Sequence, residues 1–146
     1  MNTAPVITLD GPSGSGKGTL SRLLAQQLGW AYLDSGALYR ILALAALQQQ
    51  CPLTAGPALA QLAADLPVRF VLGTTEAEDQ VYLGHQPVQT ELRSERCAQA
   101  ASQLAVLPEV RAALLAWQRR LRQPPGLVAD GRDMGTVVFP DAPVKF

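Results

Sequence analysis

The chain has 146 residues, 48% of them hydrophobic, and its twelve basic and twelve acidic side chains cancel. This composition predicts a single folded domain with a real core, and it offers no global charge for nucleic acid or an acidic membrane. The N-terminus lacks a signal-peptide pattern and no apolar run reaches ~18 residues, so we expect a cytoplasmic protein that binds neither membrane nor nucleic acid.

The first expected strand, Val6 to Leu9, and the first expected helix are joined by a glycine-rich loop. Gly29 is placed to cap the end of that helix. Its apolar residues, which fall on one helical face, are Leu20, Leu23, Leu24 and Leu28. The joining loop consists of Gly11, Pro12, Ser13, Gly14, Ser15, Gly16, Lys17, Gly18 and Thr19.

This loop has the properties of a phosphate-binding loop. Its glycines free the backbone to wrap N–H groups around phosphate oxygens, Lys17 adds a positive charge, and the following helix N-terminus favours an anion. An ordinary flexible turn is the alternative interpretation. Gly18 stands where most such loops carry Ser or Thr, and the hydroxyl is on Thr19, which indicates a kinase subclass rather than a GTPase.

A second strand, Trp30 to Leu33, is expected to precede a helix from about Ala37 to Gln50. Ser35 and Arg40 then follow the carboxyl end of a strand, where ligands bind in open α/β sheets. Both are candidate site residues. The alternatives are a helix N-cap for Ser35 and a solvated surface charge for Arg40.

The middle of the chain changes its hydrophobic period. A weaker helix is expected from Pro57 to Asp65, followed by short strands at 68–72, 80–83 and 86–88 that predict a small β insertion. His85 is expected in an exposed turn with no carboxylate or serine cluster beside it. Since the chain has no other histidine, a histidine-based triad is excluded. Cys51 and Cys97 have no paired cysteine nearby, so we expect reduced structural thiols rather than zinc or redox chemistry.

Two further helices are expected after the insertion. The first begins at Ser94 and runs to about Val106, with an alanine-rich face at Ala98, Ala100, Ala101 and Ala105. The second has Pro108 in its first turn and buries Val110, Leu114, Trp117 and Leu121. Its arginines are expected to be mostly solvated, although Arg111 stands apart at the beginning; the others are Arg119, Arg120 and Arg122.

A short buried strand, Leu127 to Asp130, ends on a carboxylate that can hold Mg²⁺ beside nucleotide phosphates, directly or through water. An ordinary aspartate turn is the alternative. Arg132 and Asp133 follow in the next loop, and Val144 to Phe146 is expected to begin another strand.

Four blocks of residues now suggest a family. They are Asp10 to Thr19, Leu33 to Arg40, Ala101 to Gln103 followed by Val110-Arg111, and Ala129 to Thr136. In this order, across essentially the whole chain, they closely resemble bacterial cytidylate kinases. The resemblance implies the α/β P-loop nucleoside monophosphate kinase fold, a parallel sheet flanked by helices. Residues 1–146 would form an incomplete kinase core, with about 63–100 as a small antiparallel β insertion on the acceptor side.

The resemblance also implies transfer of the γ-phosphoryl group of ATP to CMP or dCMP, assisted by Mg²⁺, with Lys17, Asp130 and Arg132 as catalytic residues. Gly11 to Thr19 would cradle the donor phosphates. Asp130 would organise Mg²⁺ through water, with Thr19 as a second candidate ligand. Arg40 and Arg132 would hold the acceptor phosphate, and the cytosine would be surrounded by Ser35, Ser102, Arg111 and Asp133.

Family members continue well beyond the position of Phe146, with a further strand, an arginine-rich lid and closing helices. The resemblance therefore implies that this sequence is about the N-terminal two-thirds of such a protein, and we expect a monomer. Turnover should suffer without the lid, since an arginine of that kind can contribute on the order of 10³-fold in rate. The alternatives are another P-loop small-molecule kinase, for adenylate or shikimate, and a chain that binds nucleotides without useful turnover.

Overall fold

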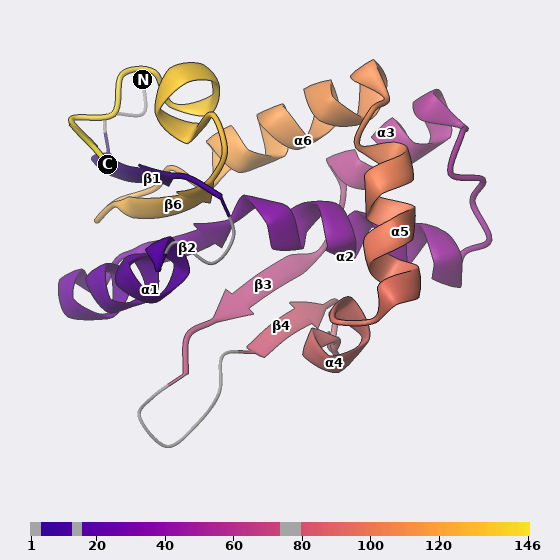
Figure 1. The fold of residues 1–146 in the computed structure, drawn as a ribbon, viewed down its shortest axis with the longest axis horizontal. Coiled ribbons are helices and arrows are strands. Elements are labelled where there is room, and N and C mark those ends of the chain that lie inside the picture. Colours follow the sequence, from indigo (N-terminus) through magenta and orange to yellow (C-terminus); the bar gives the residue numbers. More distant parts are fainter. Residues whose placement is uncertain (1–3, 13–15, 74–79) are drawn as a thin grey trace. The chain divides into compact units, whose positions relative to one another are not determined.

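The computed structural model of this protein describes residues 4–12, 16–73 and 80–146. Ser13, Gly14 and Ser15 of the predicted phosphate-binding loop lie outside these ranges. The chain divides into two compact units: unit 1 comprises Met1–Ser35 and Gln118–Phe146, and unit 2 comprises Gly36–Trp117. Figure 1 labels most of the helices and strands of the chain.

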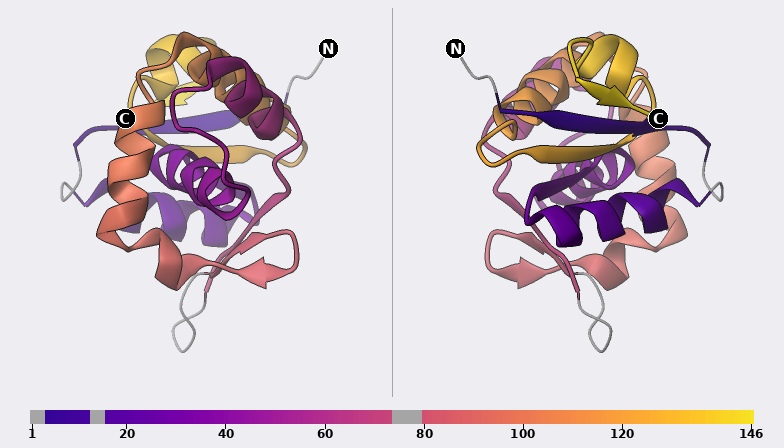
Figure 2. Two further views of the ribbon diagram at one scale, coloured as in Figure 1. Left: turned by 90° about the vertical axis from the view of Figure 1, so that its right-hand side faces the viewer. Right: turned by 90° about the vertical axis from the view of Figure 1, so that its left-hand side faces the viewer.

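Unit 1 is built on a parallel sheet with the strand order β2-β6-β1-β7. Its elements are β1 (Val6–Asp10), α1 (Lys17–Leu28), β2 (Ala31–Asp34), β6 (Leu127–Gly131), the short π-helix η1 (Met134–Val138) and β7 (Val144–Lys145). Strands β1 and β6 run side by side (Figure 2), with Val6 opposite Leu127 and Asp10 opposite Gly131. Both strands are buried almost throughout, as expected of a parallel sheet covered on its faces.

Unit 2 combines helices with the antiparallel sheet β3-β4-β5. Its elements are α2 (Ser35–Gln48, which begins in unit 1), α3 (Gly56–Ala64), β3 (Val68–Val71), β4 (Gln80–Leu83), β5 (Gln86–Pro87), α4 (Gln89–Leu92), α5 (Glu95–Leu104) and α6 (Pro108–Arg120, which ends in unit 1). Fully buried side chains of this unit include Leu38, Ile41, Leu42, Leu59, Leu104 and Leu114. The Trp117 indole N–H donates to the Leu66 carbonyl at 3.1 Å.

The expected α/β class, the parallel sheet and the antiparallel insertion strands are confirmed. Several local signals also hold. Gly29 adopts a left-handed conformation (φ 67°) after α1, and the Ser94 side chain caps α5 by accepting from the Cys97 N–H. Pro108 is the first residue of α6. These signals depend on neighbours in sequence, which is why the sequence predicted them.

The apolar stripe of α1 is not the face of the helix that is buried. Leu20, Leu23 and Leu28 are 43%, 53% and 44% exposed, and the buried residues of the helix are Ser21 and Ala25. Helix α1 packs against β6, and small side chains on the facing side let a helix approach a sheet closely. Periodicity identified the helix, but it did not identify the side that meets the sheet.

The predicted alanine face of α5 also needs correction. The buried residues are Cys97, Ala100, Ala101 and Leu104, with Ala98 exposed. Their spacing of three, four and seven places them on one helical stripe.

Two short helices, α4 and η1, were not predicted, because four or five residues carry too little periodic signal. Leu121 lies beyond the end of α6 and is only half-buried.

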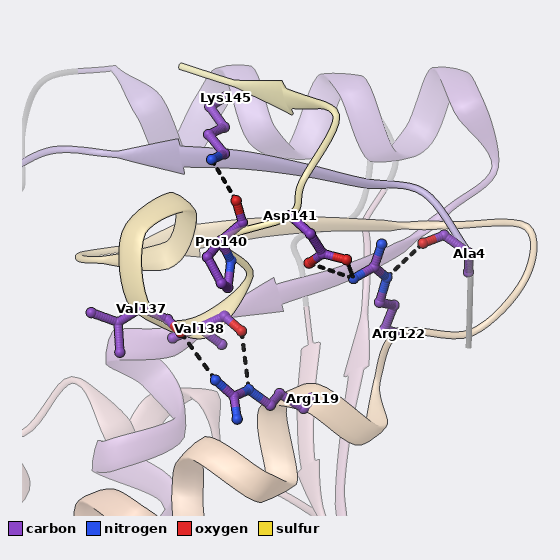
Figure 3. A network of polar contacts seen from close by, with 8 residues as sticks. All are labelled: Ala4, Arg119, Arg122, Val137, Val138, Pro140, Asp141 and Lys145. Carbon is purple, nitrogen blue, oxygen red and sulfur yellow. Dashed lines mark hydrogen bonds and ion pairs between the residues drawn. The ribbon is translucent and has the colours of Figure 1, made fainter. Parts of the chain in front are cut away.

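Two arginines expected to be solvated have structural roles (Figure 3). Arg119 donates from Nε to the Val138 carbonyl and from Nη2 to the Val137 carbonyl, both at 3.1 Å. Arg122 donates to the Ala4 carbonyl at 2.6 Å and pairs with both Asp141 oxygens at 2.9 Å. The guanidinium groups of Arg119 and Arg122 therefore bind carbonyls of η1 and of Ala4 within unit 1.

Candidate active site

The site is built where β1 and β6 end. Because these neighbouring strands are parallel, their carboxyl ends lie at the same edge of the sheet, so the loop after β1 and the loop after β6 meet. The Gly11 N–H donates to the Gly131 carbonyl at 3.3 Å and joins the two loops directly. The predicted phosphate-binding loop thus begins beside the segment that carries Asp130, Arg132 and Asp133.

Gly16 immediately precedes α1 with φ 84° and ψ −2°, in the left-handed region. A Cβ at this position would meet no atom within 4 Å, so the backbone conformation and not a lack of space favours glycine. The turn brings Lys17 into the first position of α1. Its backbone carbonyl accepts a hydrogen bond from the Ser21 hydroxyl at 2.6 Å.

The side chains of Lys17 and Asp130 form an ion pair, with 2.6 Å between Nζ and Oδ1. Their side chains are 21% and 5% exposed. A carboxylate this deeply buried needs partners, and the Tyr32 hydroxyl supplies another by donating to Oδ2 at 3.2 Å. The structure therefore brings together two of the three predicted catalytic residues, which are 113 positions apart in sequence.

Tyr32 was missed by the sequence reasoning. It lies on β2, which pairs with β6 so that Tyr32 is opposite Val128 and Asp34 is opposite Asp130. No motif marks this tyrosine. Its hydroxyl reaches Asp130 because strand order placed β2 beside β6, and that order could not be read from local sequence.

The carboxylate oxygens of Asp130 fit a magnesium site that uses a single protein carboxylate. Each of its oxygens accepts one hydrogen bond from Lys17 or Tyr32, which leaves further acceptor capacity on both. Among the described residues no group of three or more His, Cys, Asp or Glu side chains could hold a metal on its own. That is compatible with Mg²⁺, which commonly uses one or two carboxylates, waters and substrate phosphates. Thr19 is exposed in the first turn of α1.

The Asp10 side chain is a second feature that the sequence analysis did not single out. Its Oδ1 accepts from the Met134 N–H at 2.7 Å and its Oδ2 from the Gly135 N–H at 2.9 Å. The residue before Met134 is Asp133, which has φ 58° and ψ 24°. Asp10 thus joins the end of β1 to the segment that follows β6.

Ser35 is buried and lies beside the end of β6. A Cβ on Gly131 would come within 2.7 Å of the Ser35 Cβ, so the close approach of these two residues requires glycine at position 131. Arg132 and Asp133 follow and are exposed. The predicted substrate-binding residues of unit 1 are therefore neighbours at one edge of its sheet.

The other predicted substrate-binding residues, Arg40, Ser102 and Arg111, belong to unit 2, on α2, α5 and α6. The backbone carbonyl of Arg40 accepts a hydrogen bond from the Cys97 thiol at 3.2 Å. Burial raises the pKa of that thiol, while the positive charge of Arg40 opposes the shift. Burial likewise raises the pKa of Tyr39, and Arg111 opposes it. A joint role of the unit 1 and unit 2 residues stays a prediction.

The only histidine and the two cysteines lie outside this site. His85 lies in an exposed turn, and both Cys51 and Cys97 are free thiols. In the described ranges, no helix has the length and apolar character needed to cross a membrane.

A family model described as cytidylate kinase matches residues 7–146. The chain belongs to the cytidylate kinase family. The cytidylate kinase of Serratia proteamaculans (strain 568) is 59% identical over 143 residues, which are 98% of this chain and 62% of the relative. That of Yersinia enterocolitica is 58% identical over 143 residues, 98% of this chain and 61% of the relative. That of Shewanella sp. (strain W3-18-1) is 56% identical over 142 residues, 97% of this chain and 62% of the relative.

The resemblance read from the four sequence blocks is thereby confirmed. The chain spans about 62% of the length of the curated relatives that it matches.

Proposed function

We propose that this chain is a kinase that transfers the γ-phosphoryl group of ATP to CMP or dCMP. The observation that carries the proposal is the Lys17–Asp130 ion pair at the joined ends of β1 and β6. A lysine beside a glycine-rich turn and a helix N-terminus favours phosphate, and the carboxylate beside it suits the metal that accompanies nucleotide phosphates. Membership of the cytidylate kinase family supports the choice of acceptor.

On this proposal the protein contributes positioning and charge, because phosphoryl transfer asks little covalent work of it. The backbone of the loop from Gly11 to Thr19 would cradle the donor phosphates, and Lys17 would exchange Asp130 for a phosphate oxygen. Asp130 would hold Mg²⁺ through water, with Thr19 as a second candidate ligand. Bound there, Mg²⁺ would neutralise charge on the donor phosphates.

Arg40 and Arg132 would hold the acceptor phosphate, since guanidinium groups match its geometry with paired hydrogen bonds. Ser35, Ser102, Arg111 and Asp133 would surround the cytosine. A carboxylate accepts from the exocyclic amine of cytosine, whereas uracil presents a carbonyl at that position. The proposed site therefore favours CMP over UMP. We further propose a cytoplasmic monomer in which residues 63–100 form the acceptor-side insertion.

A coupled assay of ADP release with ATP, Mg²⁺ and CMP, dCMP, UMP, AMP or shikimate tests the proposal. We expect turnover with CMP and dCMP to exceed that with the other acceptors. Preferential turnover of UMP, AMP or shikimate would contradict the cytidylate assignment. If CMP raises the unfolding temperature without any turnover, the chain binds the acceptor and does not act on it.

Variants test the residue assignments by calorimetric titration of each nucleotide. Arg111→Ala and Asp133→Ala should weaken CMP binding about tenfold or more and leave ATP binding nearly unchanged, because each removes a contact to the base alone. Lys17→Ala should weaken ATP first. Arg96→Ala is the matched control for Arg111→Ala, since Arg96 is exposed on α5 and has no assigned role. Equal losses of CMP and ATP affinity in the Arg111 and Asp133 variants would refute their assignment to the base.

A further inference from the structure

The carboxylate of Asp10 holds the start of η1. Its two oxygens accept hydrogen bonds from the N–H groups of Met134 (2.7 Å) and Gly135 (2.9 Å). These N–H groups open a helix and have no partner within it, so an acceptor must come from elsewhere. A carboxylate that receives two such bonds is a strong and directional hydrogen-bond acceptor.

Asp10 lies beside both ends of the segment that contains Arg132 and Asp133. At one end its backbone is opposite Gly131 in the β1–β6 pairing, and at the other its side chain holds Met134. Two residues remain between these anchors. Strand pairing and the Gly11–Gly131 hydrogen bond hold the first end of this segment, and the Asp10 side chain holds the second.

The backbone of this segment needs such an anchor. Asp133 has φ 58°, a left-handed conformation that is sparsely populated by residues other than glycine and persists where surrounding contacts impose it. Close packing adds to the constraint, because a Cβ on Gly135 would lie 2.8 Å from the Thr8 hydroxyl oxygen. The Met134–Gly135 peptide is thus pressed against β1 on one side and bonded to Asp10 on the other.

We propose that Asp10 is a positioning residue for acceptor binding: through Met134 and Gly135 it holds Arg132 and Asp133 in the conformation that receives the acceptor nucleotide. This inference rests on the proposed function, in which Arg132 and Asp133 bind CMP. On this proposal Asp10, at the end of β1, supports binding of the acceptor nucleotide, although the loop that follows Asp10 would bind the donor nucleotide.

Arg119 provides a matched control at the opposite end of the same helix (Figure 3). It also makes two hydrogen bonds to the η1 backbone, to the carbonyls of Val137 and Val138 at 3.1 Å. Its removal loosens η1 but leaves the Asp10 contacts in place. A comparison of Asp10 and Arg119 variants therefore separates the positioning of Asp133 from the general stability of η1.

The experiment compares Asp10→Ala, Asp10→Asn and Arg119→Ala with the unaltered chain. Amide hydrogen exchange at Met134 and Gly135, measured without nucleotide, reports their hydrogen bonds to Asp10. Calorimetry gives the CMP and ATP affinities. Asp10→Ala should speed exchange at both amides and weaken CMP about tenfold, with ATP affinity changing less than about threefold. Asp10→Asn keeps one acceptor oxygen and should be intermediate. Arg119→Ala should leave these two amides and the CMP affinity nearly unchanged.

Exchange at Met134 and Gly135 that is insensitive to Asp10 overturns the positioning role. So does a loss of CMP affinity that Arg119→Ala reproduces, or equal losses for CMP and ATP. If Asp10→Ala does not fold, the same comparisons are decided by Asp10→Asn. If the unaltered chain binds no CMP, the proposed function fails, and the positioning of the segment then stands or falls on the exchange data alone.

Discussion

Both units have buried apolar side chains, but among the described residues the buried polar and charged ones lie in unit 1. The buried polar residues of the described ranges are Thr8, Ser21, Ser35, Gln118 and Asp130, and all of them belong to unit 1. The buried side chains of unit 2 are apolar and include leucines, Ile41, Val88 and Val110. A buried polar group costs stability unless it is paired, and Asp130 in unit 1 is paired with Lys17 and Tyr32.

The two units also differ in how their predicted site residues are held. In unit 1, Lys17 and Asp130 pair with each other, although Arg132 and Asp133 are exposed. In unit 2, Arg111 and Ser102 are exposed on helix surfaces. Side chains held by several contacts are preorganised, whereas exposed ones must lose rotamer freedom when a ligand binds. Lys17 and Asp130 are thus preorganised in unit 1, whereas Arg111 and Ser102 keep the rotamer freedom of exposed side chains.

The largest expected effect concerns the apolar core of unit 2. Leu114→Ala should lower the free energy of unfolding by about 3 kcal/mol, because it removes a fully buried side chain and leaves a cavity. Leu23→Ala is the matched control in unit 1: this leucine is 53% exposed, so the change should stay within about 0.5 kcal/mol. Urea unfolding monitored by circular dichroism measures both. Similar losses for the two variants would mean that α1 buries its leucines in solution.

The next effect concerns the ion pair of unit 1. Lys17→Met should lower the free energy of unfolding by about 2 kcal/mol, since it leaves the 5% exposed Asp130 side chain without its cation. The Lys17→Met/Asp130→Asn double variant should recover part of this loss. Urea unfolding of the single and double variants gives the coupling energy, expected at about 1–2 kcal/mol. A coupling energy near zero would show that the pair is a surface contact rather than part of a polar interior.

A smaller effect distinguishes the two cysteines. Burial raises the pKa of Cys97, with Arg40 opposing the shift, and no thiolate can form there without losing solvation. Cys97 should therefore react with a thiol reagent about tenfold more slowly than Cys51, which is partly exposed. Mass spectrometry after timed alkylation of the native chain measures the rates. Equal rates would indicate that unit 2 opens readily.

The raised pKa of Cys97 also makes the free energy of unfolding depend on pH. Because the folded pKa of Cys97 lies above the unfolded one, its contribution is fully present below the unfolded pKa and is lost as the pH rises through the folded value. Cys97→Ala should remove this alkaline dependence.

The smallest effect is expected at the surface of unit 1. Hydrogen bonds from Arg122 hold the pKa of Asp141 below its usual range. The contribution of this pair is present above the unfolded pKa of an aspartate and is lost as the pH falls through the folded value. Asp141→Asn should therefore lower the unfolding midpoint slightly at pH 7, and this loss should shrink as the pH becomes acidic and falls through the lowered pKa of Asp141. A loss that persists at the acidic pH would point to a cause other than the carboxylate charge.

Local sequence signals determined much of this fold. A β-branched run, a glycine-rich loop and a helical period placed β1, the phosphate-binding loop and α1 in order, and the left-handed Gly16 and Gly29 stand where backbone freedom was expected. Strand β6 was predicted from its apolar run and its terminal Asp130. These features are set by residues within a few positions of one another, whose steric and hydrogen-bonding preferences are present in the sequence itself.

Only the tertiary structure decided which of these residues contact one another. Strand order brought Tyr32 to Asp130 across 98 positions, Lys17 to Asp130 across 113, and the Asp10 carboxylate to Met134 across 124. It also selected Ser21 and Ala25 rather than the leucines as the face of α1 that meets the sheet. Such pairings depend on the relative positions of distant strands, and local sequence preferences carry no information about them.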